Sequence, residues 1–216
     1  MKNFKLAIFD LDGTILDSAG LWHEVDRAFL ASIGREWDQE YHDTMRVSDY
    51  DSGARYTIAR YGLKTTPEAL KKHWESLAQQ AYHSNLELKE GVKHVLESFR
   101  RCHVPLVLCT LSPQVLYKPA LERHGILSYF SSFYSIDRHH FDKKTPAIFQ
   151  RILQEHKVEA LSCVGFEDSP VAAQSMFKAG IKTYLIADEG QPGAKDEAPE
   201  AHYLPSWNAL TLQCLC

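Results

Sequence analysis

The sequence has few cysteines, and their number is odd: five among 216 residues. Cys109 and Cys163 lie inside apolar segments typical of buried strands, whereas Cys214 and Cys216 form an isolated C-x-C. No second pair of matching spacing accompanies it, so we do not expect a zinc site. Reduced thiols in a cytoplasmic protein are the simpler interpretation.

Long apolar runs and basic clusters are missing as well. The longest runs, such as VPLVLC (104–109), are too short to cross a bilayer. The N-terminal MKNFKLAIFD lacks the apolar region and cleavage site of a signal peptide. The net charge is −4 and no Lys/Arg block stands out. We therefore expect no membrane or nucleic-acid partner, and a monomer by default.

The chain does contain short, continuously apolar segments of the kind buried on both faces of a parallel sheet. Helical patterns separate them, at 90–101, 147–157 and 171–180. Strands that alternate with helices predict an α/β fold with a doubly wound, Rossmann-like parallel sheet. The predicted strands are 5–10, 104–110, 161–166 and 182–187, with a weaker candidate at 133–136.

Residues 18–87 interrupt this alternation and predict an inserted all-helical domain. One helix ends at Gly34, and another begins with Thr66 as N-cap and Pro67 in the first turn. A less regular helix is expected over 45–62. The apolar faces expected for the first and last of these helices consist of Trp22, Val25, Phe29 and Ile33, and of Leu70, Trp74, Leu77 and Ala81.

Two domains follow from this pattern. The α/β core consists of 1–17 and 88–216, and the helical domain of 18–87. Near the C-terminus, 188–206 is expected to be a long polar loop rich in Gly and Pro.

The segment FDLDGTILDS (9–18) places two aspartates at the end of the first predicted strand. Ligands of open α/β sheets bind at this edge, where a carboxylate can bind Mg²⁺ or attack an electrophile. Gly13 lets the backbone turn sharply beside a ligand. A solvated turn is the alternative. An EF-hand is excluded by spacing, because Ile15 and Leu21 occupy the positions of its Gly and Glu.

These residues resemble the first motif of the haloacid dehalogenase superfamily, in particular its phosphatases and β-phosphoglucomutase-like members. Further similar motifs follow in family order, and the helical insertion lies where such enzymes carry a C1-type cap. The resemblance thus extends over nearly the whole chain. The motifs are LCTLS (108–112), KKTPAIF (143–149) and VGFEDSP (164–170).

The resemblance implies a role for each of several residues. Asp10 is expected to be the nucleophile, and Asp12 the general acid that later activates water. The Thr110 hydroxyl and the Leu111 N–H are expected to hold the phosphoryl group, although a Thr at a strand end is often only a cap. Where relatives have a small or polar residue the chain has Leu111, which changes the shape of the pocket.

A lysine should neutralise the charge shared by the nucleophile and the phosphoryl group. The resemblance to the family's K-x-x-P-x-x-F pattern implies Lys143 for this role, with Lys144 as the alternative and a solvated lysine pair as the ordinary interpretation.

The resemblance also implies a Mg²⁺ site. Its ligands would be the Asp10 and Asp168 carboxylates, the backbone carbonyl of Asp12, and Glu167 directly or through water. The aspartate at position 12 favours phosphoryl transfer, because dehalogenase relatives lack an acid there.

We therefore expect a Mg²⁺-dependent phosphatase that hydrolyses a small phosphate monoester, such as a sugar phosphate, through an aspartyl phosphate. A β-phosphoglucomutase-like mutase is the alternative; mutases have a histidine where this chain has Trp22, with His23 one residue later. A non-catalytic phospho-ligand-binding protein is the third reading.

Substrate choice is expected to reside in the cap. Arg46 is a candidate for an anionic substrate group, with an exposed helical arginine as the ordinary interpretation. Further candidates for cap contacts are Trp22, His23, Met45 and Tyr50.

Overall fold

The centre of the molecule is a sheet of six parallel strands in the order β3-β2-β1-β4-β5-β6. The computed structural model describes residues 4–46, 48–139 and 141–210, except for the side chain of Arg46. β1 lies between β2 and β4, where the strand order reverses direction. The strands are β1 (Leu6–Phe9), β2 (Leu106–Thr110), β3 (Phe130–Ser135), β4 (Cys163–Glu167), β5 (Lys182–Ile186) and β6 (His202–Leu204).

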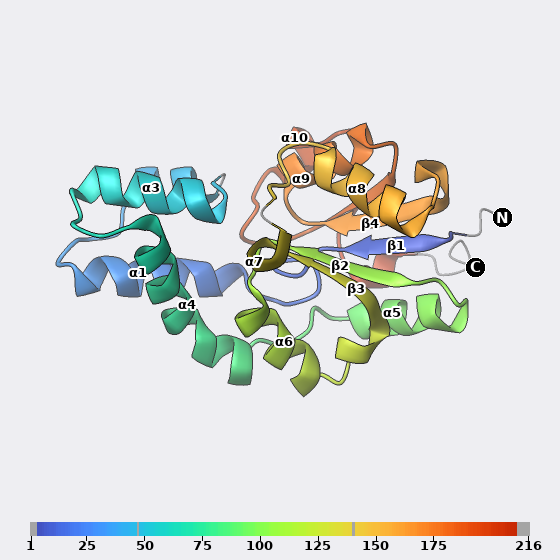
Figure 1. Ribbon diagram of the computed structural model, residues 1–216, viewed down its shortest axis with the longest axis horizontal. Helices are drawn as coiled ribbons and strands as arrows, with labels where there is room; N and C mark the ends of the chain where they lie inside the picture. Colours follow the sequence, from blue (N-terminus) through green and yellow to red (C-terminus); the bar gives the residue numbers. More distant parts are fainter. Residues whose placement is uncertain (1–3, 47, 140, 211–216) are drawn as a thin grey trace.

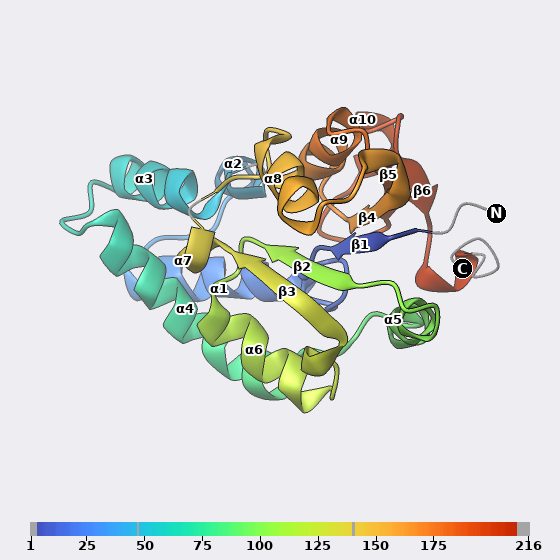
Figure 2. The same ribbon diagram turned by 45° about the vertical axis from the view of Figure 1, so that its right-hand side comes forward.

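Helices cover both faces of this sheet (Figures 1 and 2). Ala7 and Phe9 of β1 pack on one side, toward α5 and α6, whereas Leu6 and Ile8 pack on the other side, toward α8 and α9. The alternation follows from the two-residue period of a strand. Both faces are therefore buried, as the continuously apolar strands require. The helices are α5 (Val92–Arg101), α6 (Gln114–Arg123), α8 (Ala147–His156) and α9 (Pro170–Lys178).

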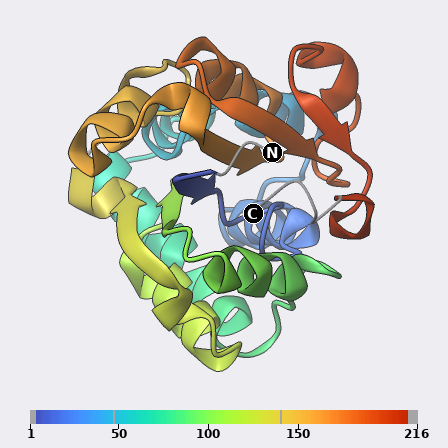
Figure 3. The same cartoon turned by 90° about the vertical axis from the view of Figure 1, so that its right-hand side faces the viewer.

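A second group of helices is inserted between β1 and α5 and extends beyond one end of the sheet (Figure 1). In the view of Figure 3 this group lies behind the sheet. Thr66 caps the last of them, since its hydroxyl accepts the N–H of Ala69 at 3.2 Å, and Pro67 occupies the first turn. Asp49 caps the third through the N–H groups of Asp51 and Ser52. The four are α1 (Ala19–Ser32), α2 (Gln39–Arg46), α3 (Tyr50–Tyr61) and α4 (Pro67–Ser84).

The chain enters and leaves this helical insertion through two adjacent segments. The Asp17 N–H donates to the Glu87 carbonyl at 2.9 Å, and Leu16 pairs with Leu88 in an isolated antiparallel bridge. The Lys89 N–H donates to the Ile15 carbonyl, also at 2.9 Å. These contacts lie beside the boundary at 17/18 and 87/88 expected from the sequence, which stays a prediction.

Short elements complete the fold. They are α7 (Ile136–His139), α10 (Ala194–Glu197) and three 3₁₀ turns at Leu127–Tyr129, Ala160–Ser162 and Trp207–Ala209. Among the described helices, none combines the length and apolarity needed to span a lipid bilayer.

The predicted fold class is confirmed, with differences in individual elements. The segment 188–206, expected to be a loop, contains α10 and the edge strand β6. The single helix expected over 45–62 is wrong: α2 ends at Arg46 and α3 begins at Tyr50. The weak strand at 133–136 is β3, which begins three residues earlier.

The apolar face predicted for the last cap helix is also partly wrong. Leu77 is exposed and Ala81 is half-buried. A face spaced every four residues is buried instead, formed by Leu70, Trp74, Ala78 and Tyr82. The correction matters because this face carries Tyr82 toward the carboxyl ends of the strands.

Of the cysteines, Cys109 and Cys163 are buried free thiols in β2 and β4. The C-x-C of Cys214 and Cys216 lies outside the described residues.

Candidate active site

Asp10 lies at the carboxyl end of the central strand, at the point where the strand order reverses. Its N–H donates to the Phe166 carbonyl of β4 at 3.0 Å, which continues the ladder of β1 by one residue. Thr110 ends β2 on one side, and Glu167 ends β4 on the other. The sheet therefore brings three polar residues, far apart in sequence, to one edge where open α/β sheets bind ligands.

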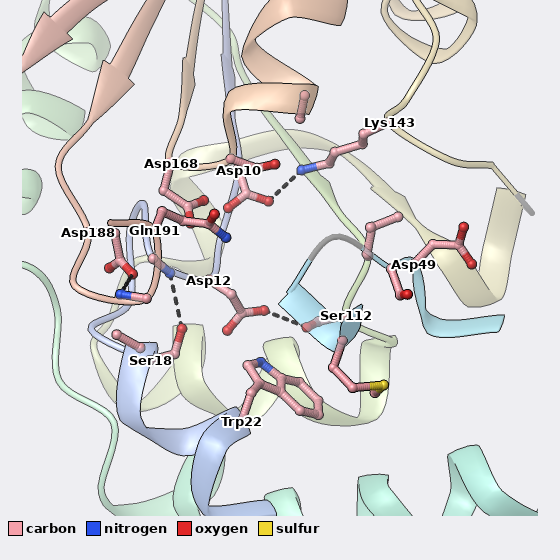
Figure 4. Close-up of a pocket in the computed structure, with 18 of the residues that line it drawn as sticks. Asp10, Asp12, Ser18, Trp22, Asp49, Ser112, Lys143, Asp168, Asp188 and Gln191 are labelled. Carbon is pink, nitrogen blue, oxygen red and sulfur yellow. Dashed lines mark hydrogen bonds and ion pairs between the residues drawn. The ribbon is translucent and has the colours of Figure 1, made fainter. Parts of the chain in front are cut away.

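Lys143 reaches this edge from the loop before α8. Its Nζ donates to Asp10 Oδ1 at 2.5 Å (Figure 4). It also donates to Glu167 Oε1 at 2.6 Å. All three side chains are more than nine-tenths buried. Burial lowers the pKa of Lys143, whereas the negative charges of Asp10 and Glu167 raise it. The combined effect of the charges is larger, so the pKa of Lys143 lies above its usual value. The ammonium thus stays charged beside Asp10.

Lys144, the alternative lysine, points elsewhere. Its side chain is 44% exposed, and its Nζ lies 3.0 Å from Asp49 Oδ2 in the cap. Hydrogen bonds help to hold the pKa of Asp49 at about 2, against the opposing effect of burial. Of the two candidates from the sequence, Lys143 is the one that contacts Asp10.

The carboxylates of Asp10, Glu167 and Asp168 form a buried acidic group. One oxygen from each lies within 4.8 Å of the other two. Burial, followed by the charges of Glu167 and Asp10, raises the pKa of Asp168 well above its usual value. Burial, followed by the charge of Asp10, raises the pKa of Glu167 to about 7. Lys143 neutralises this group only in part.

The donor set fits a magnesium ion. Asp10 Oδ2 is buried, and no described residue offers it a hydrogen bond. A hard divalent cation takes carboxylate oxygens as ligands, and it would satisfy this oxygen while offsetting the repulsion within the group. Glu167 Oε2 already accepts the N–H groups of Asp168 and Ser169, both at 3.1 Å, so its other oxygen faces Lys143.

The loop after β1 is shaped to approach this group. Gly13 has φ of +77°, a value that favours glycine, and a Cβ added there would lie 2.5 Å from Asp168 Oδ2. Thr14 Oγ1 donates to Asp168 Oδ1 at 3.3 Å. Glycine at position 13 therefore lets the two acidic loops meet.

Asp12 points away from the acidic group, and hydroxyl groups hold it. Tyr82 of α4 donates to Oδ1 and Ser112 donates to Oδ2, each at 2.5 Å. Figure 4 shows the hydrogen bond from Ser112. Burial and the charge of Asp10 raise the pKa of Asp12 to about 6, although these hydrogen bonds oppose the shift. Such a carboxyl group can exchange a proton near neutral pH.

Sequence reasoning assigned no role to Tyr82 or Ser112. Tyr82 lies on the buried face of α4, but the apolar pattern predicts Leu77 and Ala81 on that face in place of Ala78 and Tyr82. Ser112 lies inside the LCTLS motif, two residues beyond Thr110.

Thr110 is buried, and its Oγ1 accepts the Ser112 N–H at 2.9 Å. The bond uses the oxygen as acceptor and leaves the hydroxyl hydrogen for another partner. Leu111 is half-buried and lines the same cavity as Asp10.

A cavity of about 330 Å³ lies between the cap and the edge of the sheet. This volume falls in the range of small-molecule sites. Its floor is the acidic group with Lys143, and its cap wall includes four residues suggested by the sequence, Trp22, His23, Met45 and Tyr50. Arg46, the candidate for an anionic group, has its side chain outside the described part of the structure.

Comparison with known proteins identifies the family. A family model described as haloacid dehalogenase-like hydrolase matches residues 7–186. The chain belongs to this hydrolase family. The acidic group and Lys143 lie within the matched residues.

Known members of the hydrolase family match over most of the chain. A phosphoglycolate phosphatase of Vibrio cholerae is 30% identical, with 91% of this chain and 92% of the relative covered. The "Phosphorylated carbohydrates phosphatase" of Thermotoga maritima is 26% identical, with 81% of each chain covered.

A solved structure of a CbbY variant from Rhodobacter sphaeroides, in complex with xylulose-(1,5)bisphosphate, matches with a TM-score of 0.81. It is 18% identical, covers 94% of this chain and is itself 95% covered. At this identity the match supports the fold, a family core with a helical cap.

Proposed function

We propose that this hydrolase is a Mg²⁺-dependent phosphatase that cleaves a small phosphate monoester, such as a sugar phosphate, through an aspartyl phosphate on Asp10. The observation that carries the proposal is the contact of Lys143 with Asp10 beside two further buried carboxylates. An isolated structural ion pair would not need the additional buried acids, since they raise its cost. A phosphoryl site needs them to hold a cation.

The proposed reaction has two steps. Asp10 attacks phosphorus while Asp12, protonated, gives its proton to the leaving oxygen, and the alcohol departs. Asp12 then takes a proton from water, whose oxygen attacks the aspartyl phosphate and restores the Asp10 carboxylate with release of phosphate. Lys143, together with the hydroxyl of Thr110 and the N–H of Leu111, would bind the phosphoryl oxygens.

The proposed Mg²⁺ would be held by the carboxylates of Asp10 and Asp168 and the carbonyl of Asp12. Glu167 would act directly or through water. When bound, the ion supplies positive charge against the phosphoryl group.

The Asp10→Asn substitution tests the covalent step. We expect turnover of an aryl phosphate to fall by roughly 10³-fold or more, because an amide oxygen is a poor nucleophile. Circular dichroism should show an unchanged fold. Asp17→Asn, a neighbouring exposed aspartate, is the matched control and should keep wild-type activity. Full activity of Asp10→Asn would reject the covalent mechanism, and no turnover by the wild type would favour the non-catalytic binding protein.

A phosphosugar mutase remains the second candidate because His23 lines the cavity on α1. Its ring lies 5.4 Å from His42 and 4.7 Å from Trp37. Formation of an isomerised sugar phosphate in the presence of a bisphosphate would support the mutase. Release of inorganic phosphate alone would support the phosphatase.

A further inference from the structure

The first helix of the cap runs along the cavity away from the catalytic carboxylates. It starts beside Asp12, where Ser18 Oγ accepts the Gly13 N–H at 3.0 Å (Figure 4). Its residues that line the cavity include Ala19, Trp22, His23 and Asp26. Their spacing of three, four and seven residues places them on one face of the helix. This face of α1 therefore forms one wall, from the phosphoryl end to the cap end.

Asp26 is an unusual residue to find on this wall. Only 9% of it is exposed, and the structure shows no hydrogen bond or ion pair to its carboxylate from any described residue. Burial raises its pKa from 3.8 to about 7. Two other aspartates that line the cavity, Asp49 and Asp188, each have a lysine within 3.0 Å. A buried carboxylate without a partner costs stability.

We propose that Asp26 is a specificity-determining residue that accepts hydrogen bonds from hydroxyl groups at the end of the substrate remote from the phosphate. The substrate class is then a polyhydroxylated phosphate monoester, a sugar or polyol phosphate of hexose size. This inference rests on the proposed phosphatase function and adds the class of substrate to it.

The length of the wall supports a substrate of this size. At 1.5 Å per residue, Asp26 lies about 10 Å along the helix from Ala19. The phosphate ester of a two-carbon acid is shorter than this span of the wall. A hexose phosphate can reach it and fits a cavity of about 330 Å³.

The chemistry of the wall supports hydroxyl donors over an anionic group. Trp22 precedes Asp26 by one turn, and its ring lies 6.1 Å from that of Tyr50 on the same cavity. Aromatic surface with a few placed polar groups is typical of small-molecule sites, and an acceptor fixes the orientation of donors. A substrate carboxylate at this end would meet the charge of Asp26, a repulsive contact that selects against it.

The test compares kcat/KM for hexose 6-phosphate, phosphoglycolate and an aryl phosphate. The wild type should prefer hexose 6-phosphate to phosphoglycolate. Asp26→Leu should lower kcat/KM for hexose 6-phosphate by roughly 10- to 100-fold, mainly through KM, because a hydroxyl loses a charged acceptor. Asp26→Asn keeps one acceptor oxygen and the shape of the side chain, so its kcat/KM for hexose 6-phosphate should lie between those of the wild type and Asp26→Leu.

Two controls separate specificity from folding. The aryl phosphate has no hydroxyl for Asp26, so both variants should hydrolyse it within about twofold of the wild type. Glu24→Gln removes a charge from an exposed residue of the same helix and should leave kcat/KM unchanged for all three substrates. Loss of aryl phosphate hydrolysis in Asp26→Leu would indicate misfolding, and Asp26→Asn then decides.

Several outcomes would overturn the inference. One is an unchanged ratio of hexose 6-phosphate to phosphoglycolate in the folded variants, and another is a wild type that prefers phosphoglycolate. Both leave the phosphatase function standing. If the wild type hydrolyses none of the three substrates, the proposed function fails. The role of Asp26 is then tested by measuring the binding of hexose 6-phosphate by calorimetry. Equal affinity of the wild type and Asp26→Asn would then reject the role of Asp26, and weaker binding by the variant would support it.

Discussion

The contacts of Asp12 show how one residue depends on two parts of the chain. Its carboxylate accepts hydrogen bonds from Ser112 in the core and from Tyr82 in the cap. The two hydroxyl groups also lie 3.2 Å from each other. A carboxyl group fixed in this way is oriented by packing rather than by its own backbone, which makes Tyr82 a positioning residue for the proposed acid.

The Tyr82→Phe substitution removes this hydroxyl and keeps the ring. We expect kcat for a sugar phosphate to fall by roughly tenfold, because Asp12 is less well oriented to protonate the leaving oxygen. Hydrolysis of an aryl phosphate with an acidic leaving group should fall much less, since that oxygen needs little protonation. Steady-state kinetics with both substrates measures the difference.

Tyr134→Phe is the matched control, because Tyr134 donates to Glu155 at 2.5 Å and does not line the cavity. Equal losses of kcat for both leaving groups in Tyr82→Phe would contradict the positioning role.

The sequence predicts those site residues that belong to a recognisable motif. Asp10 follows from a strand end and Lys143 from the resemblance to a family motif, and the structure has them in contact. Tyr82 could not be found in this way, because it reaches Asp12 only when the buried face of α4 is known. A one-residue change in the assumed face, from Leu77 and Ala81 to Ala78 and Tyr82, decides whether the hydroxyl points at the site.

Helix α1 has two opposite effects on the stability of the cap. One face packs Val25 and Phe29 into the cap interior, and the same helix buries Asp26 without a partner. Since the charged form is disfavoured by burial, the helix is less stable in its folded position whenever Asp26 is ionised. The cap thus gives up stability at a residue that faces the cavity.

This cost has a definite dependence on pH. The pKa of Asp26 is about 7 in the folded chain and 3.8 as its usual value, so between these values the folded state binds the proton that the unfolded state has lost. The contribution of Asp26 to stability therefore falls as the pH rises from about 4 to about 7 and is constant above. Asp26→Asn should raise the free energy of unfolding at pH 8 by an amount on the order of 2–4 kcal/mol.

Urea unfolding of the wild type and Asp26→Asn at pH 4.5 and pH 8 measures this effect. The difference between the two proteins should be small at the lower pH and large at the higher. Glu24→Gln, on the exposed side of α1, should follow the wild type at both. A difference that does not grow with pH would be evidence against an unpaired Asp26.

Periodicity predicted the elements that have a regular apolar pattern and missed those that lack one. The central strands are apolar throughout, so every residue in them indicates burial. β6 contains only three residues, two of them exposed, and therefore lacks an apolar pattern. α6 went without a prediction; it contains Pro119, a residue that usually ends a helix.

For the whole molecule, folding assembles the acidic group from β1 and β4. The unfolded chain has no such site, so an ion that binds the folded state stabilises it by mass action. At a Mg²⁺ concentration of about 100 times Kd, the stabilisation is about 2.7 kcal/mol. For a chain of this length, that corresponds to a rise in Tm of roughly 5–10 °C.

Thermal unfolding with MgCl₂, and with NaCl at equal ionic strength, tests this expectation. Only MgCl₂ should raise Tm, and EDTA should reverse the rise. Asp168→Asn should lose most of the response to Mg²⁺, because it removes one of the three grouped carboxylates. Identical Tm values of the wild type in both salts would remove the metal from the proposed site.

The paired segments at the cap boundary would allow the cap to be exchanged as a unit during evolution. Asp17 and Glu87 are neighbours through a backbone hydrogen bond, so both ends of the insertion meet at one point. A foreign helical domain with adjacent ends could replace 18–87 by recombination at two sites, without moving a strand. Asp10 and Lys143 would remain paired in such a chimera, whereas Asp12 would lose the Tyr82 hydroxyl. New substrates could thus be acquired by exchange of a whole domain, provided that each incoming domain brings its own donor for Asp12.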